Sequence, residues 1–334
     1  MLSRIFHAWE HRLANVRKDR VVRPFDWGLD WLEPASTRPD PPVATVRQWV
    51  YAVMRNTDTF FDPGTTADYE LDSTGTLRFP SALATPHPEN NTVVGRWFPA
   101  KDKKRAVVVL PQWNSDAGGH VGLAKLLSQF DVSALRLSLP YHDARMPPEL
   151  TRADYIVSSN IVRTVQVCRQ AVLDARAAVA WLNAQGFDRI GILGTSLGSC
   201  LSLLTAAHEP RIRAQALNHV SPWFADVVWR GLSTRHVRAG LDGHIDLDTL
   251  RQLWRPISPF ACLERVRQTK TLLIYAKYDL TFPLDLSELL ISEFRRLGLP
   301  HQVGVLPCGH YSTGMAPFKY LDAYMLISFL RRAL

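Results

Sequence analysis

The chain has 334 residues, 46% of them hydrophobic and 21% charged, and a formal net charge of +8 at pH 7. A chain of this size can bury a core of its own without disulfides or metals to hold it together. The positive charge is spread along the sequence and is not gathered with aromatic residues on one element, so nucleic-acid binding is not indicated. No run of about 18 apolar residues is present, so we expect no membrane-spanning helix.

Residues 1–75 are expected to form a helical or irregular extension that packs on the body of the protein. The apolar positions of its first helix share one face, at Leu2, Ile5, Phe6, Trp9, Leu13 and Val16. Basic residues surround that face, and a basic amphipathic helix can make a peripheral contact with an anionic membrane. We expect this helix instead to pack on the body of the protein or on a second subunit of a homodimer.

From about residue 76 to residue 334, short buried runs alternate with helical patterns. This alternation indicates an α/β fold with a mostly parallel sheet. The expected elements are an antiparallel hairpin at 74–99, a long helix at 164–183, and strands at 106–110, 132–138, 190–193, 212–218, 271–276 and 302–306. The loop from Tyr141 to Arg145 follows one of these strands, which makes Tyr141 a candidate wall of the substrate pocket.

The strand at 190–193 runs straight into the pentapeptide Gly194-Thr195-Ser196-Leu197-Gly198. A serine at a sharp strand-to-helix turn needs neighbours without bulk, and the two glycines remove the side chains that would crowd it. The apolar run 197–207 has helical spacing, so Ser196 is expected at a helix N-terminus whose amides favour a developing negative charge. The pattern therefore indicates a nucleophilic serine.

A nucleophilic serine needs a base and an orienting acid, and both follow it in the chain. Asp279 comes directly after the strand at 271–276, and His310 comes on the loop after the strand at 302–306. Strand ends on one edge of a parallel sheet are where ligand sites lie. Asp285 also follows the first of these strands, but it falls inside the helix that Pro283 opens, where we expect a solvated carboxylate.

These motifs resemble those of the α/β-hydrolase superfamily of serine esterases, and the resemblance covers about residues 76–334. It is carried by the pentapeptide around Ser196, by Tyr278-Asp279 with Pro283, and by Gly309-His310. It implies an eight-stranded, mostly parallel sheet with helices on both faces, and no metal or organic cofactor. The layout is most similar to that of little-characterised bacterial members, so the resemblance gives a reaction class but hardly a substrate.

In that fold an oxyanion hole is built from the amide after the nucleophile and from an amide in the loop after the third strand. The first amide would be that of Leu197. The loop here reads Pro111-Gln112-Trp113-Asn114, where many relatives carry His-Gly or Gly-Gly. By position the Trp113 amide is the expected second donor, and the Gln112 amide is the alternative.

The resemblance also places a cap insertion at about residues 221–256. This segment carries four large aromatic side chains, at Trp223, Phe224, Trp229 and Trp254. They can form an apolar roof over an acyl group, with Trp223 and Phe224 as candidate pocket residues, or they can anchor the cap to the body.

We therefore expect a serine hydrolase that cleaves a carboxylic ester of a small acyl substrate, with Ser196, His310 and Asp279 as its triad. A thioesterase or a peptidase would use the same parts, and a non-catalytic binding or scaffold protein of the same fold is the alternative of another class. Four scattered cysteines and the lack of a secretory leader favour a cytoplasmic protein. No histidine spacing typical of a zinc site occurs.

Overall fold

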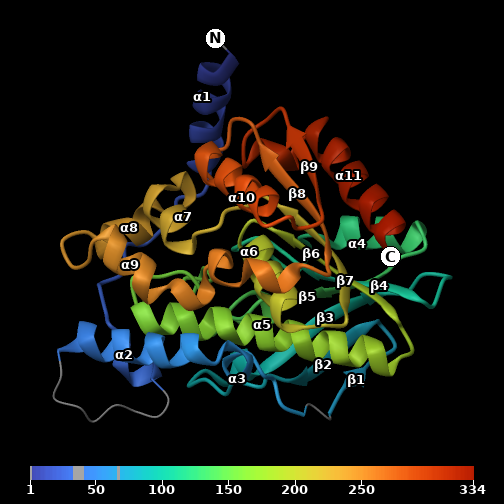
Figure 1. The fold of residues 1–334 in the computed structure, drawn as a ribbon, viewed down its shortest axis with the longest axis horizontal. Coiled ribbons are helices and arrows are strands. Elements are labelled where there is room, and N and C mark those ends of the chain that lie inside the picture. The colour runs from blue at the N-terminus through green and yellow to red at the C-terminus, as the bar shows by residue number, and fades with distance from the viewer. Residues whose placement is uncertain (1, 33–40, 66–67) are drawn as a thin grey trace.

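The computed structural model describes residues 2–32, 41–65 and 68–334, and a nine-stranded sheet lies at its centre (Figure 1). The strand order is β1-β2-β3-β5-β4-β6-β7-β8-β9. The strands are β1 (Glu70–Leu71), β2 (Thr76–Pro80), β3 (Thr92–Phe98), β4 (Arg105–Leu110), β5 (Ser133–Leu137), β6 (Arg189–Thr195), β7 (Ile212–Asn218), β8 (Lys270–Ala276) and β9 (His301–Leu306).

The six strands from β5 to β9 in this order are parallel, whereas β1, β2 and β3 form an antiparallel edge. Each strand expected from the sequence is present, with ends within two residues of the prediction, and the expected hairpin is β2 with β3. The sheet has one strand more than the eight expected, because the two-residue β1 pairs with β2 at the edge. A pairing that short has no recognisable sequence pattern.

Helices cover both faces of the sheet, as the parallel strands require. The helices are α1 (Leu2–Ala14), α2 (Pro42–Arg55), α3 (Thr57–Phe60), α4 (Val121–Gln129), α5 (Ile161–Ala184), α6 (Leu197–His208), α7 (Phe224–Arg230), α8 (Arg235–Leu241), α9 (Leu247–Leu253), α10 (Leu284–Arg296) and α11 (Phe318–Ala333). Successive residues of β4 point to opposite faces, so Val108 packs with α5 and α6 while Val107 packs with α4 and α11. The cap region at 221–256 holds α7, α8 and α9.

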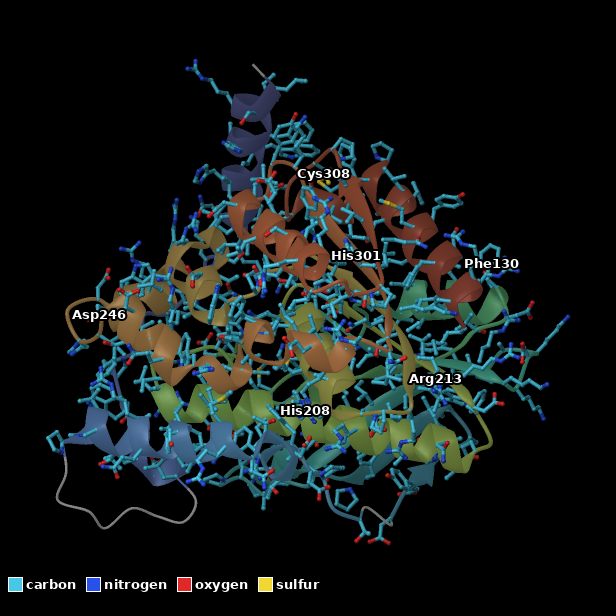
Figure 2. The ribbon with its side chains drawn as sticks, viewed as in Figure 1. Phe130, His208, Arg213, Asp246, His301 and Cys308 are labelled. Atoms are coloured by element: carbon cyan, nitrogen blue, oxygen red, sulfur yellow. The ribbon has the colours of Figure 1, made fainter. Side chains whose placement is uncertain are left out.

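The N-terminal helix α1 packs at the carboxyl end of the sheet, and its first turn stands away from the body (Figure 1). The ring of Phe6 stacks on that of Tyr278, with 4.5 Å between the centroids. Figure 2 labels His301 at the start of β9 and Cys308 just past its end, on the side of α1. Helix α1 therefore lies against the loops that follow β8 and β9. The expected extension 1–75 includes residues 1, 33–40 and 66–67, which lie outside the described residues.

Within the described ranges, no helix is both long enough and apolar enough to pass through a membrane. The cysteines Cys168, Cys200, Cys262 and Cys308 are all free thiols.

Candidate active site

Ser196 lies at the sharp turn between β6 and α6 that the sequence predicted. Its backbone has φ 56° and ψ −118°, a conformation that costs energy for a residue with a side chain. The turn is held in place because the Ser196 amide donates to the carbonyl of Asn218 at 2.8 Å. The flanking positions have no room for a side chain, so both must be glycine. A Cβ on Gly194 would lie 2.0 Å from the carbonyl oxygen of Gly198, and a Cβ on Gly198 would lie 2.2 Å from that of Leu110.

Ser196 and His310 line one cavity of about 940 Å³ at the carboxyl ends of the parallel strands. The walls come from the loops after β4, β6, β7, β8 and β9, from the cap, and from the chain that precedes α5. Helix α4, the N-terminal part of α11, and the end of α1 with the chain that follows it complete them. Ligand sites of open parallel sheets lie at this edge. No direct hydrogen bond joins the Ser196 hydroxyl to His310 in the described chain, and such bonds are often long in the absence of a substrate.

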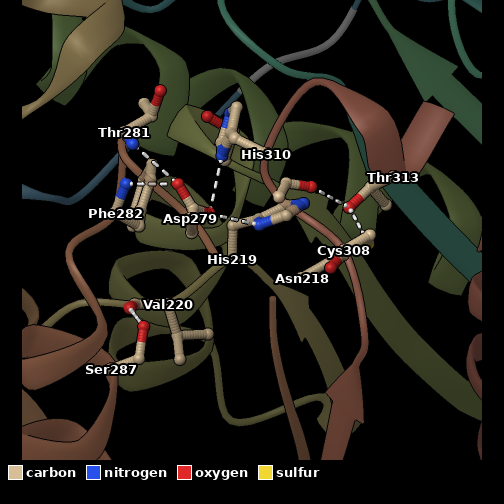
Figure 3. Close-up of polar contacts among 12 residues, drawn as sticks. Asn218, His219, Val220, Asp279, Thr281, Phe282, Ser287, Cys308, His310 and Thr313 are labelled. Carbon is tan, nitrogen blue, oxygen red and sulfur yellow. Dashed lines mark hydrogen bonds and ion pairs between the residues drawn. The ribbon is translucent and has the colours of Figure 1, made fainter. Parts of the chain in front are cut away.

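Asp279, on the loop after β8, holds His310 (Figure 3). One carboxylate oxygen, Oδ2, accepts from His310 Nδ1 at 2.9 Å and from His219 Nδ1 at 2.8 Å. The other oxygen accepts from the backbone amides of Thr281 and Phe282, both at 2.7 Å. An ionised carboxylate only accepts, so each imidazole carries its proton on Nδ1. In neutral His310 this leaves Nε2 free to take a proton.

The electrostatics of this group favour an ionised acid and a basic histidine. Burial would raise the pKa of Asp279, but the charge of His310 and the hydrogen bonds from both histidines hold it well below its usual range. Burial would also lower the pKa of His310. The charge and hydrogen bond of Asp279, followed by the charge of Glu10, outweigh that effect and raise it. His310 is therefore more basic than an ordinary imidazole.

His219 is a second partner of Asp279 that the sequence did not identify. It follows β7 with φ 59°, its side chain is 2% exposed, and its ring centroid lies 4.3 Å from that of His310. Burial and then the neighbouring His310 charge lower the pKa of His219, so this ring is neutral near pH 7. Its position at a strand end was the available signal, but nothing in the sequence pairs it with Asp279.

The ligand atoms of His219, Asp279 and His310 lie within 4.8 Å of one another, a spacing at which side chains can hold a metal ion. Both Nδ1 atoms are engaged with Asp279 through their protons. A metal would have to displace these protons, so the geometry fits a hydrogen-bonded acid and base better than a set of metal ligands.

The residues expected to donate to an oxyanion all line the cavity: Gln112 and Trp113 on the loop after β4, and Leu197 at the start of α6. The next amide in the loop, that of Asn114, is turned to His142 and donates to its Nε2 at 2.9 Å. Burial lowers the pKa of His142 to about 4, which keeps Nε2 available as an acceptor. In the described chain the Gln112 and Trp113 amides have no hydrogen-bond partner. Both remain candidates for the second donor.

The four cap aromatics divide into two groups. Trp223 and Phe224 line the cavity. Trp254 is fully buried, and its indole nitrogen donates to the carbonyl of Ile161 at 3.1 Å, so it anchors the cap to α5. Trp229 packs against the guanidinium of Arg238, 4.9 Å from the ring centroid.

The placement of Tyr141 differs from the expectation. It is fully buried, and among the described residues it does not belong to the cavity lining. Its φ of 63° turns the chain sharply after β5, and its hydroxyl lies 3.0 Å from His87 Nδ1. Arg145 is also buried and pairs with Asp174 at 2.8 Å. This loop packs against the segment around Asn90 and against α5, and it contributes no wall to the pocket. Asp285, by contrast, lies on the surface as expected, in a pair with Arg230 at 2.7 Å.

An acidic group on α11 also lines the cavity. Asp322 Oδ2 accepts from the side-chain amide of Asn218 at 2.9 Å. Asp322 Oδ1 and Asn218 Oδ1 are buried without a hydrogen-bond partner in the described chain. Burial raises the pKa of Asp322 to about 7, although the Asn218 hydrogen bond opposes the rise.

No family model matches the sequence, and no curated protein matches it either. Solved structures are similar in fold. The acylaminoacyl peptidase of Pyrococcus horikoshii superposes with a TM-score of 0.60 at 15% identity, over 81% of this chain and 42% of the peptidase. This chain therefore spans less than half the length of that protein.

Two further structures are covered over most of their length. Acetyl xylan esterase 1 from Thermoanaerobacterium gives a TM-score of 0.57 at 14% identity, over 96% of this chain and 98% of the esterase. An α/β hydrolase from Penicillium gives 0.52 at 16% identity, over 72% of this chain and 94% of the hydrolase. With the strand order and the strand-to-helix turn at Ser196, these similarities show that the chain has the α/β-hydrolase fold.

Proposed function

We propose that the protein is a serine hydrolase that cleaves a carboxylic ester through an acyl-enzyme intermediate. The observation that carries this proposal is the convergence of two features on one cavity. A serine in a strained turn at a helix N-terminus and a histidine paired with a buried carboxylate both reach it. Strained residues cluster at functional sites.

In the proposed reaction the Ser196 oxygen attacks the acyl carbon while His310 Nε2 takes its proton. Asp279 holds the ring and stabilises the imidazolium. The Leu197 amide, with that of Trp113 or Gln112, stabilises the negative oxygen of the tetrahedral intermediate. His310 then protonates the departing alkoxide, which leaves as an alcohol. Water, deprotonated by His310, releases the acid from Ser196 in a second attack of the same kind.

An ester is preferred over an amide or a thioester because two of the similar structures described above are an esterase and a peptidase, and the esterase is the one covered over nearly its full length. Trp223 and Phe224 give the cavity an apolar wall suited to an acyl chain. A thioesterase, a peptidase and a non-catalytic protein are outcomes that the following experiment separates.

The test is turnover of nitrophenyl esters, an acyl thioester and an acylated peptide by the wild type and by Ser196→Ala. We expect ester turnover to exceed peptide turnover, and Ser196→Ala to lose at least about a thousandfold. Ser202→Ala is a matched control, because Ser202 is buried on the same helix and its hydroxyl has no hydrogen-bond partner in the described chain. Faster cleavage of the thioester or the peptide would replace the ester assignment. No turnover of any substrate would favour a binding protein.

A further inference from the structure

We propose that Glu10, on helix α1, is a positioning residue for the proposed hydrolysis, because its carboxylate holds the loop that carries His310. This inference rests on the proposed function of His310 as the base. It assigns a role in the active site to an element that the sequence placed outside the catalytic domain.

The Glu10 carboxylate accepts three hydrogen bonds from the two residues after His310. Its Oε2 accepts from the Tyr311 amide at 2.8 Å. Its Oε1 accepts from the Ser312 amide at 3.0 Å and from the Ser312 hydroxyl at 2.7 Å. The carboxylate therefore fixes the backbone of this loop immediately beyond the histidine.

The residue before His310 is tied to the same group. The Gly309 amide donates to the Ser312 hydroxyl at 2.9 Å, and that hydroxyl in turn donates to Glu10. A Cβ on Gly309 would lie 2.3 Å from the carboxyl carbon of Glu10, so only glycine allows α1 to approach this closely. The loop is therefore bound to Glu10 on both sides of His310.

Glu10 is fully buried, and it forms no ion pair with any described residue. A buried carboxylate without a cation is costly unless its oxygens are satisfied by hydrogen bonds. The donors from this loop are the ones that satisfy it. A side chain of this kind is poorly explained by packing alone, because an apolar residue would fill the same space without that cost.

Two other contacts keep α1 in place at this edge. Phe6 stacks on Tyr278, the residue that precedes Asp279, so the same helix touches the loops of both the acid and the base. Arg20, beyond the end of α1, donates to the Tyr311 hydroxyl at 2.9 Å. The helix therefore fixes the loops of Asp279 and His310 relative to each other.

The charge of Glu10 also acts on His310. The charged or titratable groups that face the ring are Asp279 after β8, His219 after β7, Glu10 on α1, and Arg20 through Tyr311, and Asp322 on α11 lines the same cavity. Burial lowers the pKa of His310, and Asp279 and then Glu10 raise it. Removing the Glu10 charge is therefore expected to lower the pKa of His310.

The test compares Glu10→Gln and Glu10→Ala with the wild type and with Arg12→Gln, a control at an exposed position of the same helix. Turnover of a short nitrophenyl ester is expressed per site labelled by a fluorophosphonate, so that unfolded protein does not count. We expect kcat per labelled site to fall about 10- to 100-fold with KM little changed, since a misplaced base costs that much. The acidic limb of the pH profile should move to lower pH in Glu10→Gln.

A purely structural role predicts a different result: fewer labelled sites, but the same kcat per site and the same acidic limb. That outcome would overturn the inference and leave the proposed function intact. If the wild type neither hydrolyses esters nor labels, the proposed function itself fails. An NMR titration of His310 in Glu10→Gln is independent of turnover, and an unchanged titration midpoint would contradict the proposed effect of the Glu10 charge on the base.

Discussion

Asp279, the proposed triad acid, has more hydrogen-bond partners than it needs for holding one histidine. Two backbone amides fix one of its oxygens, and two imidazoles share the other. Because it is fully satisfied by donors, it stays ionised despite its burial. The two imidazoles are not equivalent. The pKa of His310 is raised and that of His219 is lowered, so they should respond differently to substitution.

Replacing either histidine by glutamine tests which one is the base. His310→Gln is expected to reduce ester turnover by at least about a thousandfold, as loss of a catalytic histidine does. His219→Gln can still donate to Asp279, so it should keep turnover within about tenfold of the wild type. Steady-state kinetics on folded variants give both numbers. A larger loss of turnover in His219→Gln than in His310→Gln would show that His219, and not His310, is the base.

Asp322 provides a test based on pH and stability. Its pKa is raised from 3.8 to about 7, so between these values the folded chain holds a proton that the unfolded chain has lost. This proton contributes to the free energy of unfolding, and its contribution is fully present below pH 4 and is lost as the pH rises through about 7. Asp322→Asn cannot ionise, so the variant should not lose stability as the pH rises. Its side-chain amide can also donate to Oδ1 of Asn218, which has no partner in the described chain.

The melting temperature of Asp322→Asn should therefore exceed that of the wild type at pH 8 by about 4 °C or more, since each kcal/mol moves it by roughly 2–4 °C in chains of about 150–250 residues and by somewhat less in a longer chain. At pH 4.5 the two should be nearly equal. Calorimetry or circular dichroism at the two pH values measures this. An equal difference at both pH values would show that Asp322 does not titrate as described.

At the scale of elements, the cap contributes both a wall and an anchor. Trp223 reaches the cavity, whereas Trp254 is buried against α5. Trp223→Ala should shift the preferred acyl-chain length, because each buried methylene contributes about 0.8 kcal/mol. Trp254→Ala should lower the unfolding free energy by roughly 3–5 kcal/mol and leave the rate ratios of short and medium esters unchanged. Unchanged ratios in Trp223→Ala would reject the apolar wall.

The elements that the sequence predicted are those with a local signal. The buried runs that became β4 and β6 to β9 and the two glycines around Ser196 are visible without tertiary information. Tyr141 does not line the pocket as expected. Residues at strand ends usually face the ligand, whereas a positive φ turns this residue into the core. The pairing of β1 with β2 was missed because two residues carry no pattern.

At the scale of the whole molecule, what the sequence did not predict depends on long-range contacts. Glu10 and Ser312 are separated by 302 positions, and only the folded chain brings them together. The same holds for His219 and Asp279, which are 60 positions apart and follow the neighbouring strands β7 and β8. A lone glutamate in an amphipathic helix looks like an ordinary surface charge. Its burial against the loop of His310 is visible only once the sheet edge is assembled.

The central claim is that Ser196 is a nucleophile activated within this cavity. The most direct measurement is the intact mass of the protein after reaction with a fluorophosphonate, followed by mapping of the modified peptide. We expect one adduct per chain, located on Ser196, and none in Ser196→Ala under the same conditions. An unmodified wild type, or an adduct that persists in Ser196→Ala, would contradict it.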